Sequence, residues 1–204
     1  MKLMHPCTKV TRMLSLERDR TALLVMDLQN DIVGMLGTRA EALLDRSAAL
    51  VAAARAANVP VIYVVVGFRP GYPELSANNA AFAAVAKTGR FVGTSAADVA
   101  AAVAPREHDV IVVKHRVSAL HGTDLDLVLR AQRRDTLVMC GIATSGVILS
   151  TVRAAADADY RLVVAKDACA DRDDEVHRVL VDKVLAHQAA VVDASEVVAA
   201  LAAA

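Results

Sequence analysis

The chain has 204 residues; 55% of them are hydrophobic, only 3% are aromatic, and equal numbers of acidic and basic residues give a formal net charge of +0. This length suits one domain with a substantial core, and the apolar fraction excludes a disordered chain. A neutral chain lacks the basic face that binding to nucleic acid or to an anionic membrane requires, so we expect neither partner.

The N-terminus and the cysteines indicate the compartment. The N-terminal residues contain no apolar segment of signal-peptide length, and no apolar run approaches the ~20 residues of a membrane span. Cys7, Cys140 and Cys169 are odd in number and widely spaced, which indicates neither a disulfide framework nor a zinc site. We therefore expect a cytoplasmic protein with an N-terminal extension over residues 1–20 and a single domain over residues 21–204.

Strand-like and helix-like patterns alternate from residue 21 onward. The expected strands are apolar runs at 21–27, 60–68, 109–115, 135–141, 161–168 and 189–194. Helical spacing marks 39–59, 123–134, 144–160, 172–187 and 195–203, with Thr123 and Thr144 as expected N-caps. Because the strands are apolar throughout, they should be buried on both faces, as in a parallel sheet covered by helices. The sequence predicts a three-layer α/β/α Rossmann-like fold around a six-stranded parallel sheet.

Residues 69–108 interrupt this alternation. The segment contains Pro, Gly and Asn residues and is too long for a simple connection between a strand and a helix. Long loops of this kind often carry function, so we expect the segment to cover or line a site.

The side chains that close the strands are candidates for chemistry, because ligands of an open parallel sheet bind outside the carboxyl ends of its strands. Asp27 closes the first strand and Lys114 the third, which would bring an acid and an amine to one edge. Singly, each could be a solvated strand end or a surface ion pair; together with a glycine-containing turn they indicate a catalytic site. The other residues expected at this edge are Phe68, Arg69, His115, Arg116, the turn 141–146 and Asp167.

The stretches around these residues resemble one known family. They are "LLVMDLQNDIV" (23–33), "VVKHRVSALHGTDLDLVLRA" (112–131) and "LVMCGIATSGVILSTVRAAADADYRLVVAKDACAD" (137–171). They look like the isochorismatase-like hydrolases, a group that includes nicotinamidases, carbamoyl and ureido amidohydrolases, and isochorismatases. The resemblance spans residues 20–195, nearly the whole chain.

The resemblance implies a six-stranded parallel sheet with the active site at its strand ends. It implies that Asp27 is the general acid or base and that Lys114 holds it in its working state. It also implies a non-proline cis peptide bond between Ile142 and Ala143, which aims backbone N–H groups at a developing oxyanion. The substrate-binding residues expected from these motifs are Gln29, Ile142, Ala143 and Ser145.

The sequence departs from most of the family at the nucleophile. Most members carry a cysteine after the fourth strand, at the position that is Gly146 here, and a glycine cannot form a thioester. Cys140, Cys169 and Ser145 are the alternatives. Cys140 lies within an apolar strand and is expected to be a small core residue, and Ser145 is expected to point in a different direction from the missing side chain.

Glycine at this position has a precedent within the family. The isochorismatases of siderophore and phenazine pathways keep the Asp and the Lys, have glycine in place of the cysteine, and act on vinyl ethers. A vinyl ether is hydrolysed by protonation of its terminal carbon, a step that needs a general acid and no nucleophilic side chain. By this resemblance Asp27 would donate the proton, Lys114 would orient it, and Gly146 would leave room. Vinyl-ether hydrolysis of the isochorismate type is therefore favoured, although the segments around Arg69 and Arg116 differ from those of true isochorismatases.

A carboxylated ring substrate needs cations and apolar walls. Arg69 and Arg116 could each bind a carboxylate through two parallel hydrogen bonds, but they could equally pair with Glu74 or Asp124. The aromatic candidates are Phe68 and Tyr72 for the pocket walls, and Phe82 and Phe91, for which core packing is at least as good an explanation.

We expect no catalytic metal ion and no cofactor. Nicotinamidases of the family bind a divalent ion through an Asp and two His after the second strand, and residues 69–82 contain neither residue type. His115 and His121 are not at a recognised ligand spacing, and His177 and His187 are expected at the surface.

Three functional hypotheses stay open. The favoured one is a hydrolase of a small-molecule substrate that works without a cysteine. The second is an amide or imide hydrolase of the same family that uses water or a displaced thiol. The third is a silent ligand-binding pseudoenzyme, against which a retained buried charged pair argues because it costs desolvation energy. A homodimer or higher homo-oligomer is expected from the flat Ala-rich helix faces at 39–57 and 147–156.

Overall fold

The computed structural model describes residues 14–95 and 98–203, so Cys7 and much of the predicted N-terminal extension lie outside the described residues. One six-stranded sheet has the order β3-β2-β1-β4-β5-β6, and all paired neighbours are parallel. The predicted fold class is confirmed. The strands are β1 (Thr21–Met26), β2 (Val61–Val66), β3 (Val110–Lys114), β4 (Thr136–Ile142), β5 (Arg161–Ala170) and β6 (Ala190–Val192).

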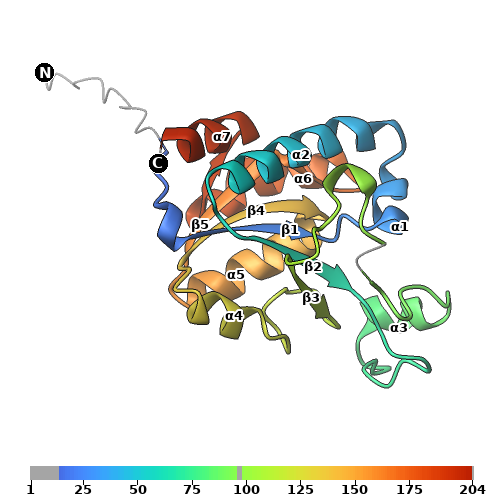
Figure 1. The fold of residues 1–204 in the computed structure, drawn as a ribbon. Coiled ribbons are helices and arrows are strands. Elements are labelled where there is room, and N and C mark those ends of the chain that lie inside the picture. Colours follow the sequence, from blue (N-terminus) through green and yellow to red (C-terminus); the bar gives the residue numbers. More distant parts are fainter. Residues whose placement is uncertain (1–13, 96–97, 204) are drawn as a thin grey trace, which may run out of the picture.

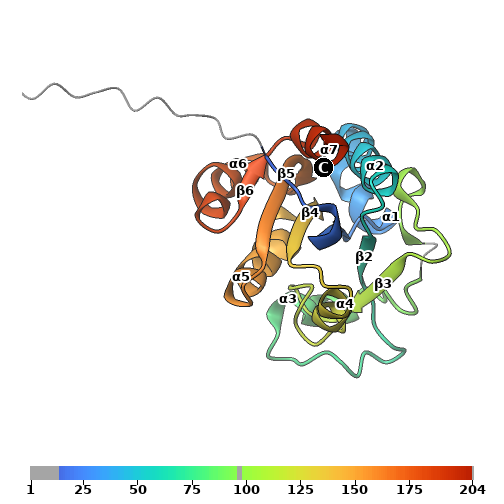
Figure 2. The same cartoon turned by 60° about the vertical axis from the view of Figure 1, so that its left-hand side comes forward.

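Helices cover both faces of the sheet (Figures 1 and 2). On one face α2 (Ala40–Ala56) packs beside α7 (Ala194–Ala203), and on the other lie α4 (Leu125–Ala131) and α5 (Leu149–Asp157). Further helices are α1 (Asn30–Val33), α3 (Ala80–Ala86) and α6 (Asp174–Val179), and short 3-10 or π turns lie at Arg18–Arg20, Gly34–Arg39, Ala101–Val103, Thr144–Ile148, Leu180–Val184 and Leu185–His187. Within the described ranges no helix is both long and apolar enough to cross a membrane.

The sheet separates two buried clusters of apolar side chains. Successive residues of a strand point to opposite faces, so Leu23 and Val25 pack on the side of α2 and α7, while Leu24 and Met26 pack on the side of α4 and α5. Every residue of β1 and of β2 is buried. Burial of each such Leu, Val or Met side chain stabilises the fold by about 1.5–3 kcal/mol. This stabilisation holds the central strands in place, and the candidate site lies at their carboxyl ends.

Strand β5 is longer than predicted. It continues to Ala170 after an irregularity in its pairing with β4. Asp167 therefore lies within the strand instead of at its end, and its carboxylate accepts a hydrogen bond from the Ala194 N–H at 2.6 Å. The residue that follows the strand is Asp171, so the edge of the sheet presents a different carboxylate from the one predicted.

The two predicted N-caps have different outcomes. Thr144 is the first residue of the π turn Thr144–Ile148 and its side chain does not cap the helix. Thr123 does cap the start of α4, because its hydroxyl oxygen accepts a hydrogen bond from the Leu125 N–H at 3.3 Å, whereas the Asp124 side chain makes no capping bond. The helix predicted at 172–187 is divided into α6 and two short turns.

The segment 69–108 has two parts with different positions. The first contains α3, which lies beyond the carboxyl end of β2 (Figure 1), and an isolated bridge joins Phe68 to Val92 at its base. The second returns to the body of the domain, where Val99 forms a bridge with Gln29 and the turn that follows packs against α2. Both parts therefore reach the edge formed by the carboxyl ends of β1 and β2.

Candidate active site

The carboxyl ends of β1 and β3 bring the predicted acid and amine into contact. Asp27 follows β1, Lys114 ends β3, and the Lys114 Nζ lies 2.9 Å from the Asp27 Oδ2. The side chains of Lys114 and Asp27 are only 3% and 8% exposed. Asp27 has a φ of 55°, a region that non-glycine residues seldom adopt and that is enriched at functional sites.

Burial dominates the electrostatics of Asp27. Removal from water raises the pKa of its carboxyl above the ordinary value of 3.8, and the charge and hydrogen bond of Lys114 offset this only in part. Its Oδ1 is buried without a hydrogen-bond partner among the described residues. Such an unpartnered atom costs about 1–3 kcal/mol and is rare. This oxygen is therefore a place where the carboxyl can hold a proton or meet a ligand.

The carboxyl end of β4 approaches β1 very closely. Gly141, within β4, has a φ of +139°, and a Cβ there would lie 1.9 Å from the Met26 carbonyl oxygen. Because no side chain fits, glycine is required for this strand to lie beside the end of β1, one residue before Asp27. The predicted cis peptide bond between Ile142 and Ala143 follows directly and is confirmed.

Gly146 lies in a more open environment. A Cβ at this position would be 3.8 Å from the Ala143 Cβ and 3.9 Å from the Val117 Cγ1, which are ordinary contacts. Its N–H donates to the Ala143 carbonyl oxygen at 3.1 Å. Val117 follows Lys114 by three residues, so one segment contacts both Asp27 and position 146. Packing around a Cβ atom therefore does not require glycine at this position.

Two residues that sequence reasoning missed hold this turn. Asp171 accepts a hydrogen bond from the Ser145 N–H through Oδ2 at 2.7 Å. The Nδ1 of His177 lies 2.7 Å from the Thr144 hydroxyl. The expectation that His177 is a surface residue is wrong, since it is half-buried and burial lowers the pKa of its imidazole. The sequence signal for Asp171 is an acid directly after the fifth strand. It was missed because the strand was predicted to end at residue 168 and not at Ala170.

Comparison with known proteins identifies the family of this chain. Residues 21–196 match the model of the isochorismatase domain. The chain belongs to the isochorismatase family. YecD of Escherichia coli O157:H7, an uncharacterized isochorismatase family protein, is 33% identical over 191 residues, which cover 93% of this chain and 100% of the relative. RutB of Azorhizobium caulinodans, a ureidoacrylate amidohydrolase, is 33% identical over 177 residues, which cover 76% of this chain and 78% of the relative. The crystal structure of a cysteine hydrolase from Pseudomonas syringae pv. phaseolicola matches with a TM-score of 0.85 and 26% identity over 95% of this chain and 99% of that chain.

This isochorismatase-family protein is a hydrolase, and its described cysteines are both buried. Burial raises the pKa of the Cys140 thiol to about 12 and raises that of Cys169 well above its ordinary range. The Cys140 thiol donates to the Leu24 carbonyl oxygen at 3.6 Å, within the core. Since the thiolate is the nucleophilic form, these two thiols are poor candidates for a displaced nucleophile.

Arg69 and Arg116 differ in their partners. Arg69 forms an ion pair with Glu74 at 2.6 Å, and its side chain is 71% exposed. Arg116 donates from Nη1 to the carbonyl oxygens of Glu74 at 3.0 Å and of His115 at 2.6 Å. Among the described residues it forms no ion pair, with Asp124 or any other carboxylate. Of the two arginines, Arg69 is therefore the one whose charge is neutralised by Glu74. The charge of Arg116 is not neutralised by a carboxylate of the described residues.

The aromatic candidates of this hydrolase form a cluster. Phe68 is only 3% exposed, and its ring centroid lies 5.6 Å from that of Tyr72, 5.8 Å from that of Phe82 and 5.9 Å from that of His115. The Tyr72 hydroxyl donates to the Arg90 carbonyl oxygen at 2.9 Å. The cluster fastens the segment around α3 to the end of β3, and a role of Phe68 and Tyr72 as pocket walls stays a prediction.

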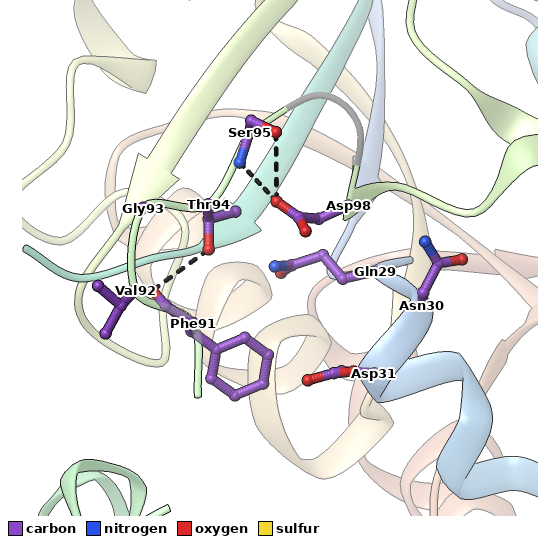
Figure 3. Close-up of a pocket in the computed structure, with 9 residues that line it drawn as sticks. All are labelled: Gln29, Asn30, Asp31, Phe91, Val92, Gly93, Thr94, Ser95 and Asp98. Atoms are coloured by element: carbon purple, nitrogen blue, oxygen red, sulfur yellow. Dashed lines mark hydrogen bonds between the residues drawn. The ribbon is translucent and has the colours of Figure 1, made fainter. Parts of the chain in front are cut away.

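Gln29 lies between the site and a polar cavity. Its amide donates to the Val66 carbonyl oxygen at 3.0 Å and accepts from the Val66 N–H at 2.8 Å, which joins the ends of β1 and β2. The adjoining cavity has a volume of about 250 Å³. Its walls are the start of α1 and the loop that contains Thr94 and Ser95 (Figure 3). Among the described residues no group of three or more His, Cys, Asp or Glu is placed to hold a metal ion. The expected contact of Gln29 with substrate stays a prediction.

Proposed function

We propose that this hydrolase cleaves a small carboxylated or cyclic substrate without a cysteine nucleophile, with Asp27 as general acid and base and Lys114 as its support. The observation that carries the proposal is the state of the Asp27 carboxyl, which is buried, has a raised pKa and has one unpartnered oxygen. A carboxyl that retains its proton can act as a general acid. Vinyl-ether hydrolysis is the favoured reaction because it needs such an acid and no thiol.

The reaction begins with transfer of the Asp27 proton to the terminal CH₂ of an enol ether. The C=C electron pair forms the new C–H bond, and the positive charge is shared by the adjacent carbon and the ether oxygen. Water attacks that carbon and returns a proton to the Asp27 carboxylate. The resulting hemiketal loses its alcohol as the C–O bond breaks and its hydroxyl proton moves to the leaving oxygen. Substrate plus water thus gives an alcohol plus a ketone, which is pyruvate when that carbon carries a carboxylate.

Lys114 supports both halves of this cycle. Its ammonium, 2.9 Å from the Asp27 Oδ2, stabilises the carboxylate that remains after proton transfer, while burial favours the protonated form before it. The space beside Gly146, bounded by Ala143 and Val117, is available to the substrate where most relatives are expected to place a sulfur atom.

Pyruvate release tests the proposal. Purified protein is given two enol ethers, isochorismate with two carboxylates and 2-(cyclohexyloxy)acrylate with one, and pyruvate is followed by a coupled assay that consumes NADH. D27N is compared with D135N, the same change at the opposite end of the sheet. We expect release by the unchanged protein and by D135N, and none by D27N. Failure of the unchanged protein to release pyruvate from either ether contradicts vinyl-ether hydrolysis.

A second candidate is hydrolysis of an amide or imide, in which Asp27 removes a proton from the attacking water. The relatedness to ureidoacrylate amidohydrolases favours it, and the burial of the described thiols favours water as the nucleophile. Ammonia release from ureidoacrylate, without pyruvate release from either ether, would select this reaction. Absence of both reactions would favour a ligand-binding pseudoenzyme.

A further inference from the structure

Three cationic side chains at the ends of β2 and β3 are compensated differently. Lys114 is paired with Asp27 at 2.9 Å, and Arg69 is paired with Glu74 at 2.6 Å. Arg116 is half-buried and has no carboxylate partner among the described residues. A partly desolvated cation without a counter-charge is unfavourable, so Arg116 is a place for the anionic group of a ligand.

Hydrogen bonds fix the direction of the Arg116 guanidinium. Its Nη1 donates to two backbone carbonyl oxygens, of Glu74 and of His115. Its Nε and Nη2 donate to no group of the described residues. The Nε and Nη2 N–H groups are parallel, and their spacing matches the two oxygens of a carboxylate. One edge of the guanidinium is therefore anchored, and the other is ready for a bidentate contact.

The backbone of Arg116 belongs to the catalytic edge. Its carbonyl oxygen accepts a hydrogen bond from the Lys114 Nζ at 3.3 Å, and the same Nζ contacts Asp27. The next residue, Val117, borders the space beside Gly146. A ligand held by Arg116 is thus bound by the same short segment that contacts the acid and the open position.

We propose that Arg116 is the carboxylate-binding and specificity-determining residue of this site. This rests on the proposed function, since it places the substrate's carboxylate relative to Asp27. The edge formed by the Arg116 Nε and Nη2 would bind that carboxylate through two parallel hydrogen bonds, and the substrate would extend from there toward Asp27 and the space beside Gly146. An enol ether that carries a carboxylate should therefore be preferred to a neutral one.

Binding of simple probes tests this without turnover. Benzoate and its neutral analogue benzamide are titrated into the full chain and followed by protein-observed NMR. We expect benzoate to bind about 10- to 100-fold more tightly than benzamide, as for a contact with a charged group. Equal affinity for benzamide and benzoate overturns the proposal.

Variants assign the effect to Arg116. R116Q should weaken benzoate about 10- to 100-fold, and R69Q, a matched change at the paired arginine, should leave it unaltered. R116K retains the charge but not the parallel N–H edge, so it should bind benzoate with intermediate affinity. R116Q also removes the hydrogen bond to the Glu74 carbonyl oxygen and could lower the stability of that loop, which thermal unfolding would reveal. In that case the affinity of R116K for benzoate is the result that tests the proposal. R116Q and R116K binding benzoate as the unchanged protein does would rule out this site.

Turnover separates this proposal from the proposed function. If an enol ether that carries a carboxylate releases pyruvate but R116Q leaves its kcat/KM unchanged, the function stands and the proposal for Arg116 fails. If neither ether reacts while benzoate binding still depends on Arg116, the carboxylate site stands and vinyl-ether hydrolysis fails. With a reactive ether, R116Q should raise KM more than it lowers kcat, because the contact with the carboxylate is present in both ground and transition states.

Discussion

The two ends of the same sheet carry oppositely charged pairs in very different surroundings. At the amino end Arg20 and Asp135 form an ion pair whose side chains are 55% and 41% exposed, beside an open cavity of about 510 Å³. At the carboxyl end Lys114 and Asp27 are 3% and 8% exposed, and one carboxyl oxygen has no partner among the described residues. Exposed pairs cost little and occur on any surface, whereas a buried and incompletely bonded pair is unfavourable for stability. The difference in burial is what distinguishes the pair to which we assign the proposed chemistry from an ordinary surface ion pair.

The largest expected contrast between the two ends is in activity. D27N removes the proposed proton donor and should lower kcat/KM on a reactive enol ether by about 100- to 10,000-fold, the usual contribution of a general acid. D135N should change it less than about twofold, since exposed surface pairs act locally. Steady-state pyruvate release measures both, and a D27N variant within tenfold of the unchanged protein would show that Asp27 is not the acid.

A second contrast lies within the carboxyl end, between Gly141 of β4 and Gly146 of the π turn that follows. G141A places a Cβ 1.9 Å from the Met26 carbonyl oxygen and should lower the free energy of unfolding by about 4 kcal/mol or more, a value typical of severe steric conflict. G146A has 3.8 Å of clearance to its nearest neighbour and should change it by less than about 1 kcal/mol. Urea unfolding compares them, and similar losses in both variants would mean that the close approach of β4 to β1 is misplaced.

Removing the cation of each pair tests the difference in burial directly. K114M leaves Asp27 buried without its partner and should cost about 3 kcal/mol of stability at neutral pH. R20M should cost about 0–1 kcal/mol, as for exposed pairs. The K114M deficit should shrink at lower pH, where Asp27 is protonated and needs no counter-charge. Equal losses at neutral pH would remove the distinction between the two ends.

The smallest expected effect is the pH dependence that Asp27 adds to stability. Because its pKa is raised in the folded state above 3.8, the native protein retains a proton that the unfolded chain has lost. This contribution is fully present below the unfolded pKa and disappears as the pH rises through the folded one. Urea unfolding across that range should show the unchanged protein losing stability relative to D27N, and D135N following the unchanged protein. A gain in the stability of the unchanged protein relative to D27N as the pH rises would reverse the assigned direction of the shift.

The amino-acid sequence predicts the sheet and the meeting of Asp27 with Lys114 because both depend on local pattern. Uninterrupted apolar runs such as Ala22–Met26 have no favourable place except a doubly covered parallel strand. Once the strands are parallel, Asp27 and Lys114 must meet at one edge. The cis bond after Ile142 was available only through the family resemblance, since no residue type at that position indicates it.

The parts that could not be predicted depend on contacts between distant segments. The end of β5 is set by its irregular pairing with β4, so Asp171 was not recognised as the acceptor for the Ser145 N–H. The contact between Thr144 and His177 joins residues that are 33 positions apart. The sequence also could not show whether Arg69 or Arg116 is neutralised by Glu74, because this depends on the fold of the segment around Glu74.

The central claim is that Asp27 can carry a proton where an ordinary aspartate has lost it. The ¹³C resonance of its carboxyl, identified by its absence from D27N, reports this across a pH titration of the full chain. We expect the resonance to keep the position of a protonated acid at pH values above 3.8 and to change only as the pH rises through a higher pKa. A titration at or below 3.8 would show a carboxylate that is ionised throughout, and Asp27 could not then be the general acid of this hydrolase.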